Sequence, residues 1–103
     1  MGCTRNNILF NPDQAVGTAL VDVMNIPPSA CEGEMSFNKD VTNPVDGSEI
    51  YIGLGGKNPT ATDYHIKLSD ATPGYVMDGL IVGPVRAIAN MAAVLQTFVP
   101  FRG

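Results

Sequence analysis

The sequence predicts an α+β fold, in which a small antiparallel sheet packs against a C-terminal helix and an N-terminal helix. Three observations lead to this prediction. Residues 49–68 hold two stretches in which apolar and polar side chains alternate, residues 84–99 form an apolar run with one charge, and residues 12–24 begin with a helix-start pattern. The chain has 103 residues, a length typical of one domain with one core, and we expect a single domain over 1–103.

The clearest predicted element is an antiparallel hairpin over residues 49–68. Alternation with a period of two places one set of side chains in the core and the other set in water. The set predicted to face the core is Ile50, Ile52, Leu54, Tyr64, Ile66 and Leu68. Tyr51, His65 and Lys67 then lie on the solvated face. The connecting loop, 55–63, contains two glycines, and we expect positive φ angles there.

Residues 84–99 are predicted to form a helix that is buried over most of its circumference. Pro84 suits the first helical position, and the four alanines of the run favour a helix. Arg86, Asn90 and Gln96 fall on one narrow polar stripe of that helix. The alternative is a pair of strands that places the same three residues on the outward parity, with a bend at Asn90, because short apolar runs are ambiguous by periodicity.

Residues 12–24 have the patterns of both a helix and a strand. Asn11 suits a helix N-cap and Pro12 the first helical position, and apolar side chains follow at helical spacing. Gly17 and several β-branched residues argue for a strand instead. If 12–24 and 84–99 are both strands, the alternative fold is all-β, a small barrel or sandwich.

The charges of the chain exclude two classes of partner. The net charge is −4 and the six Lys and Arg form no cluster, whereas a nucleic-acid-binding surface needs a basic patch. The apolar run 84–99 raises the question of a membrane span, but Arg86 lies within it, at a cost of roughly 2.5–3.5 kcal/mol in lipid. We therefore expect neither nucleic acid nor a membrane as partner.

The sequence contains no catalytic, cofactor-binding or metal-binding constellation. His65 is the only histidine, and with Asp63 it provides two ligands, too few for a zinc site. The glycine-rich segment 53–58 ends in Gly-Lys-Asn, but it lacks both the glycine spacing of a phosphate-binding loop and the Ser or Thr after the lysine. We expect a protein that is not an enzyme and needs no cofactor or metal.

The chain has two cysteines, Cys3 and Cys31. Their spacing matches no zinc or redox motif. They could form one disulfide, but Cys3 lies close to the chain terminus. We therefore expect two free thiols, a state that fits a reducing compartment.

The composition indicates a subunit of an assembly. Charged residues are 16% of the chain and apolar residues 45%, with 11 Gly and 8 Pro. Such low charge leaves apolar surface that is better suited to contact with another subunit than to water. We expect aromatic and apolar residues near the two ends to anchor this contact, with an arginine at its rim. The predicted interface residues are Phe10, Phe98, Val99, Phe101 and Arg102.

In its composition and in the hairpin 49–68, with a loop of Gly, Asn and Thr, the sequence resembles the small accessory structural proteins of tailed-phage virions, of the capsid-decorating or tail-associated kind. The resemblance includes no diagnostic motif, so no residue role is carried over from it. It implies a non-enzymatic structural subunit that is made in the bacterial cytoplasm, is located in the virion, contacts other protein subunits and forms a homo-oligomer.

The alternative function is a monomeric β-rich module that binds carbohydrate or protein, and the alternative location is the cytoplasm. The contact surface of such a module would be the hairpin loop 55–62, with Tyr51 and Lys57 as binding residues. A mass measurement in solution separates a monomeric module from an oligomeric subunit.

Overall fold

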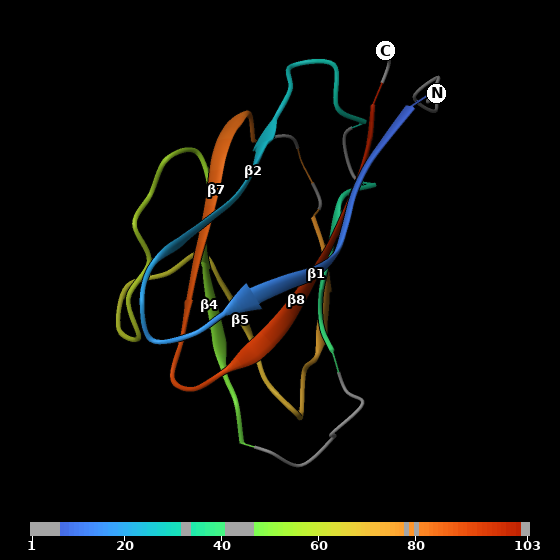
Figure 1. The fold of residues 1–103 in the computed structure, drawn as a ribbon. Coiled ribbons are helices and arrows are strands. Elements are labelled where there is room, and N and C mark those ends of the chain that lie inside the picture. The colour runs from blue at the N-terminus through green and yellow to red at the C-terminus, as the bar shows by residue number, and fades with distance from the viewer. Residues whose placement is uncertain (1–6, 32–33, 41–46, 78, 80, 102–103) are drawn as a thin grey trace.

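The structure, a computed structural model, describes residues 7–31, 34–40, 47–77, 79 and 81–101, and within these ranges it contains strands and no helix. The strands are β1 (Asn7–Val16), β2 (Val21–Ile26), β3 (Ser36–Lys39), β4 (Ile50–Gly53), β5 (Ile66–Leu68), β6 (Gly74–Val76), β7 (Gly83–Ala89) and β8 (Ala93–Phe101). Sheet A has the order β1-β8-β3-β6 and sheet B the order β2-β7-β4-β5. All neighbours are antiparallel, and the two sheets pack as a sandwich (Figure 1).

The predicted α+β fold is wrong, because residues 84–99 form two strands and not a helix. The strand-pair alternative describes this segment: Arg86 and Gln96 lie at outward positions, and the chain turns at Asn90 between β7 and β8. The physical reason is the set of neighbours. β7 pairs with β2 and β4, and β8 pairs with β1 and β3, so the backbone groups of both strands find partners on two sides. The fold class is therefore the all-β sandwich that was the alternative.

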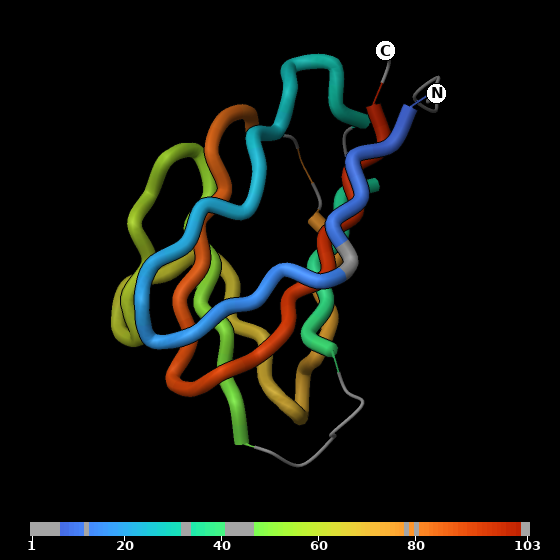
Figure 2. The backbone as a smooth tube through the Cα atoms, in the orientation of Figure 1, coloured from blue at the N-terminus to red at the C-terminus, as the bar shows by residue number. Residues whose placement is uncertain are grey.

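The predicted helix over 12–24 is also wrong. The chain runs along sheet A as β1, crosses at residues 17–20 and continues in sheet B as β2. β7 and β8 make the same crossing in the opposite direction. The Ala89 amide donates to the Gly17 carbonyl at 2.7 Å, so the two crossings lie side by side and close one edge of the sandwich (Figure 2). A β-bulge in each of β1 and β2 gives the strands the extra bend that this crossing needs.

The hairpin predicted over residues 49–68 is confirmed. β4 and β5 pair antiparallel with Ile50 opposite Leu68, and both side chains are fully buried. Tyr64 is placed differently from the prediction, because it precedes β5 and does not follow its alternation. Its side chain is exposed, and its ring centroid lies 5.3 Å from that of Tyr51, which has outward parity on β4.

The core between the sheets is apolar, with one buried ion pair at its margin. Its largest fully buried apolar side chains include Phe37, Ile26, Met35, Ile50, Ile52, Leu68 and Leu95. Lys39 has inward parity at the end of β3 and is only 3% exposed. Its ammonium contacts the carboxylate of Asp70, whose other oxygen accepts a hydrogen bond from the Gly47 amide at 2.9 Å. This network joins β3 to the segments that precede β4 and follow β5.

Cys31 is fully buried and disulfide-bonded, so the expectation of free thiols is wrong for this residue. Cys3 lies outside the described residues. The Cys31 amide donates to the Pro100 carbonyl at 2.7 Å, which ties the segment after β2 to the last strand. Sequence spacing carries no information about such a bond, because a disulfide depends on where the folded backbone brings two Cβ atoms.

Candidate protein–protein interface

Sheet A has one face in the core and one face in solvent, because successive side chains of a strand point to opposite sides. On β8 the inward residues Leu95, Thr97 and Val99 are fully buried. The outer face of sheet A consists of Ile8, Phe10, Ala15, Ser36, Asn38, Gly74, Val76, Val94, Gln96 and Phe98, while Pro100 has the same parity but is fully buried. None of these residues is charged. Asp13, the carboxylate of β1, lies in the β-bulge between paired positions.

A row of uncharged side chains crosses all four strands of this face, and we call it the apolar row because three of its four members are apolar. Phe10 on β1 lies opposite Phe98 on β8, Phe98 opposite Ser36 on β3, and Ser36 opposite Val76 on β6. Among the residues that the structure describes, the two ends of the row are the most exposed large apolar side chains, Phe10 at 62% and Val76 at 60%. The rings of Phe10 and Phe98 meet edge to face with centroids 6.3 Å apart, an arrangement that aromatic pairs favour. An uncharged surface with exposed aromatic groups is typical of the centre of a protein–protein interface.

The outer face of sheet B is different, because it carries ion pairs. The Arg86 Nε–H donates to Asp22 at 2.9 Å, and the Lys67 ammonium lies 3.1 Å from the carboxylate of Glu49. The Tyr51 hydroxyl also donates to Glu49, at 2.8 Å. The sandwich therefore has one charged face, with the composition of ordinary surface in water, and one face without charge.

Glu49 gives the charged face a predicted pH dependence. The Lys67 ammonium, and next the Tyr51 hydroxyl, hold the pKa of Glu49 below its usual value of 4.5. Folding thus favours the carboxylate form, so its contribution to stability is complete above the usual value and is lost as the pH falls through the lowered pKa. In urea unfolding, we expect the stability difference between wild type and Glu49→Gln to shrink as the pH falls below 4.5. A difference that stays constant from about pH 6 to about pH 3 would contradict this.

The structure places the predicted interface residues in three different settings. Phe10 and Phe98 lie together in the apolar row. Val99 is fully buried in the core, so it has no surface to offer a partner. Phe101, at the end of β8, is half-buried and forms a bridge to Ala30. Arg102 lies outside the described residues.

Sequence reasoning missed two residues of this surface, Ile8 and Val76. Ile8 is 52% exposed and has the same parity as Phe10. A strand prediction for this segment would therefore have placed both side chains on the same face. Val76 is far from Phe10 along the chain. It joins the row only because β8 and β3 lie between their two strands, and no local signal in the sequence reports that order.

The loop between β4 and β5 is held in place by Arg86 from β7. The Arg86 Nη1 donates to the Gly56 carbonyl at 2.8 Å and to the Asn58 side chain at 2.9 Å. Gly55 and Gly56 have φ angles of 63° and 91°, as expected for the glycines of this loop. A side chain at Gly53 would place its Cβ 2.3 Å from the Lys57 carbonyl oxygen, so the loop folds back closely on the strand that leads into it.

The residues proposed for the alternative binding module are engaged within the chain. Tyr51 is only 6% exposed, so its ring offers no open stacking surface. The Lys57 ammonium lies 2.8 Å from the carboxylate of Asp63. The other lysines and arginines that the structure describes, Lys39, Lys67 and Arg86, are also ion-paired.

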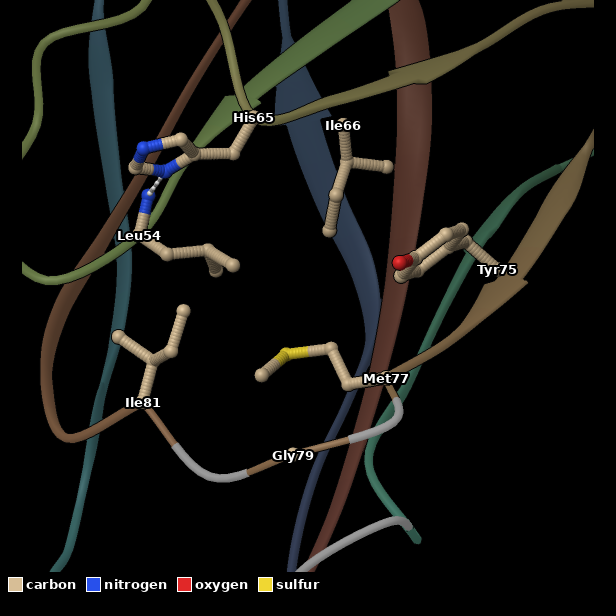
Figure 3. Close-up of a pocket in the computed structure, with 7 residues that line it drawn as sticks. All are labelled: Leu54, His65, Ile66, Tyr75, Met77, Gly79 and Ile81. Carbon is tan, nitrogen blue, oxygen red and sulfur yellow. Dashed lines mark hydrogen bonds between the residues drawn. The ribbon is translucent and has the colours of Figure 1, made fainter.

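A cavity of about 290 Å³ opens between β5 and β6, at the edge of the sandwich away from β1 and β2. It is lined by Leu54, His65, Ile66, Tyr75, Met77, Gly79 and Ile81 (Figure 3). The His65 Nδ1 accepts a hydrogen bond from the Leu54 amide at 2.9 Å, so the neutral ring carries its proton on Nε2. The hydroxyl of Tyr75 points toward the cavity. Among the residues that the structure describes, this lining provides space for an apolar group, but no carboxylate or thiol that could act with the imidazole.

The part of the chain that the structure describes lacks two further classes of site. It contains no group of three or more His, Cys, Asp or Glu side chains arranged to hold a metal ion. The same residues form no helix that is long and apolar enough to cross a membrane. The outer face of sheet A is therefore the candidate functional site.

The sequence matches no protein-family model and no curated protein. Among solved structures, it is similar to a chain in the acid-stable capsid structure of Helicobacter pylori bacteriophage KHP30, with a TM-score of 0.54 and 14% sequence identity. The alignment covers 97% of this chain and 92% of that chain. The likeness shows that the two chains share a fold along almost their whole lengths.

Proposed function

We propose that this chain is a non-enzymatic structural subunit of a virion, which docks on a larger protein shell through the outer face of sheet A. The difference between the two outer faces of the sandwich carries this proposal. Sheet A presents an uncharged face four strands wide with Phe10 and Val76 more than half exposed, whereas sheet B presents ion pairs. A surface of the first kind gains free energy when a partner covers it.

The extent of this face suits such a contact. A standard interface buries about 800 Å² per partner, which is about one seventh of the 5529 Å² surface of this chain. Neighbouring strands lie about 4.8 Å apart, so a face four strands wide is of this order once its rim is included. Full burial of a side chain such as Phe10 or Val76 contributes about 1.5–3 kcal/mol.

Two findings support a virion as the setting. The related chain belongs to a phage capsid, and the similarity covers both chains almost entirely, which favours a capsid-decorating role over a tail-associated one. Cys31 is disulfide-bonded, and disulfides persist on virion surfaces but are rare in the cytosol. We therefore favour the virion over the cytoplasm as the final location, with synthesis in the bacterial cytoplasm.

The proposed partners are other protein subunits, including further copies of this chain. Nucleic acid and membranes are not among them in this proposal, because the lysines and arginines described are neutralised by carboxylates. The role is mechanical: the subunit covers and reinforces a shell by contact area. It needs no cofactor or metal.

The proposal is tested by the incorporation of variants into purified particles, counted by quantitative mass spectrometry. We expect Phe10→Ser and Val76→Ser each to reduce the copies per particle, and the double variant to reduce the affinity at least about tenfold, the effect of 1.4 kcal/mol. Val82→Ser is the matched control, because Val82 is 45% exposed but precedes β7 and lies outside the outer face of sheet A. Full incorporation of the double variant, or an equal loss with the control, would contradict docking through this face.

A further inference from the structure

The two edge strands of sheet A, β1 and β6, lie at opposite ends of the order β1-β8-β3-β6. Each has one side paired and one side free of strand partners among the residues that the structure describes. A free strand edge is a row of backbone donors and acceptors that can pair with another chain.

On β6 the outward groups belong to Gly74 and Val76. Residues of an antiparallel strand alternate between bonding to one neighbour and facing the other side. The Met77 amide donates to the Met35 carbonyl at 2.8 Å, so odd-numbered residues of this segment bond toward β3. The amides and carbonyls of Gly74 and Val76 therefore face the free edge.

On β1 the outward groups belong to Ile8 and Phe10. The Val94 carbonyl on β8 accepts from the Asp40 amide at 2.9 Å, so even-numbered residues of β8 bond toward β3 and odd-numbered ones toward β1. Ile8 and Phe10 lie opposite even-numbered residues of β8. Their own amides and carbonyls therefore face the free edge. Pro12, two residues further on, has no amide proton and limits the available edge to residues 7–11.

The directions of the two edges also fit. All neighbours in sheet A are antiparallel, so β1 and β6 run in opposite directions. A second copy in the same orientation as the first therefore brings its β1 antiparallel to the β6 of the first copy, and the alternation of the sheet continues across the boundary. Neither edge has a charged residue within 7–11 or 74–76. Two copies with a net charge of −4 each repel one another, and contact through uncharged edges keeps this repulsion small.

We propose that copies of this chain associate head to tail, with residues 7–11 of one copy adding to β6 of the next copy as a fifth strand of sheet A. The register pairs Ile8 with Val76 and Phe10 with Gly74, which matches the outward backbone groups of both strands. In this register the side chain of Ile8 lies beside that of Val76. The side chain of Phe10 lies beside Gly74, which has no side chain to obstruct it. The inference specifies the self-contact of the homo-oligomer in the proposed function, on which it rests.

The area of this contact favours a closed ring over an open pair. The exposed parts of Ile8, Phe10 and Val76 together amount to roughly 300 Å², well below the approximately 800 Å² per partner of a standard interface. In a closed ring each copy uses both edges, so the buried area per copy doubles. Head-to-tail contacts close into rings when each contact rotates the next copy and extend into filaments when the rotation does not close, and the twist between neighbouring strands of a sheet supplies such a rotation.

The test uses proline at the two outward positions. Ile8→Pro and Val76→Pro each remove an amide that faces the free edge, a position where strands tolerate proline, so the fold is retained and one half of the contact is lost. In sedimentation velocity, we expect the wild-type chain to form a closed oligomer with a mass that is a multiple of 10.9 kDa. Each variant alone is expected to associate at least about tenfold more weakly.

Mixing the two variants decides between head-to-tail and symmetric contacts. Each variant keeps the edge that the other lacks, so ¹⁵N-labelled Ile8→Pro titrated with unlabelled Val76→Pro should show saturable amide shifts at residues 74–77. A symmetric contact between two β1 strands would instead leave Val76→Pro dimeric and residues 74–77 unshifted, and that outcome overturns the proposal. A wild-type chain that is monomeric at every concentration overturns it too.

Side-chain variants keep the test decisive if a proline disturbs the fold. Ile8→Lys and Val76→Lys place a charge at each edge, and Val82→Lys is the control at an exposed valine away from both edges. We expect the first two, and not the third, to weaken association by a similar factor while circular dichroism stays unchanged. These measurements use the isolated chain, so a failure here is distinct from a failure of incorporation into particles.

Discussion

Asp70→Asn is expected to lower the free energy of unfolding by about 3 kcal/mol, because it removes the carboxylate from an ion pair whose ammonium is buried. The side chain of Lys39 is 1% exposed and that of Asp70 is 26% exposed, so the ammonium loses a close negative charge that water cannot replace. The neutral amide can still accept from the Gly47 amide, which places the loss at the low end of the usual range. Urea unfolding at neutral pH, followed by circular dichroism, measures it.

Asp63→Asn is the matched control for this prediction. Its ion pair with Lys57 is solvated, with 72% of the Asp63 side chain exposed, and exposed pairs contribute less than about 1 kcal/mol. The double variant Lys39→Met with Asp70→Asn should recover much of the stability, since neither charge of this pair is then left in the core. Equal losses for Asp70→Asn and Asp63→Asn would refute the importance of the buried pair.

Phe37→Ala is expected to lower the free energy of unfolding by about 3–5 kcal/mol. Phe37 lies on β3, a central strand of sheet A, and its side chain is fully buried. Truncation removes a large apolar contact and leaves a cavity that the two sheets cannot close. Because domains of this kind are stable by only about 5–15 kcal/mol, the variant should melt far below wild type in a thermal scan.

Phe10→Ala is the matched control, since it makes the same chemical change on the outer face of the same sheet. Phe10 is 62% exposed and contacts Phe98 with one ring edge, so we expect a loss of less than about 1 kcal/mol in the isolated chain. A loss as large as that of Phe37→Ala would make Phe10 a residue of the fold and argue against its role in a contact surface.

Some of this architecture is determined locally. The alternation of Ile50 and Ile52 with polar neighbours is complete within a few residues, so the hairpin 49–68 could be predicted. Glycine adopts positive φ angles more readily than other residues, so the two glycines of the loop predicted such angles, and both have them. The low charge of the chain is a property of composition, and it led to the expectation of a contact surface before any element was placed.

Other features depend on partners that are distant in sequence. Residues 84–99 fit both a helical pattern, which their alanines favour, and a strand pattern, and only the four neighbouring strands of β7 and β8 make the strand the lower-energy choice. A helix satisfies its own hydrogen bonds within a few residues, whereas a strand needs partners elsewhere in the chain. Local propensity therefore points to the helix, and the folded chain contains the strands.

The candidate site divides in the same way. By itself the sequence determined that the chain is poor in charge and has aromatic residues near both ends, and on this basis it predicted Phe10 and Phe98 as contact residues. Only the tertiary structure decided that they lie side by side, that Val99 points inward, and that Val76 extends their row. Strand order and parity set these relations, and both arise from non-local pairing that no short stretch of sequence encodes.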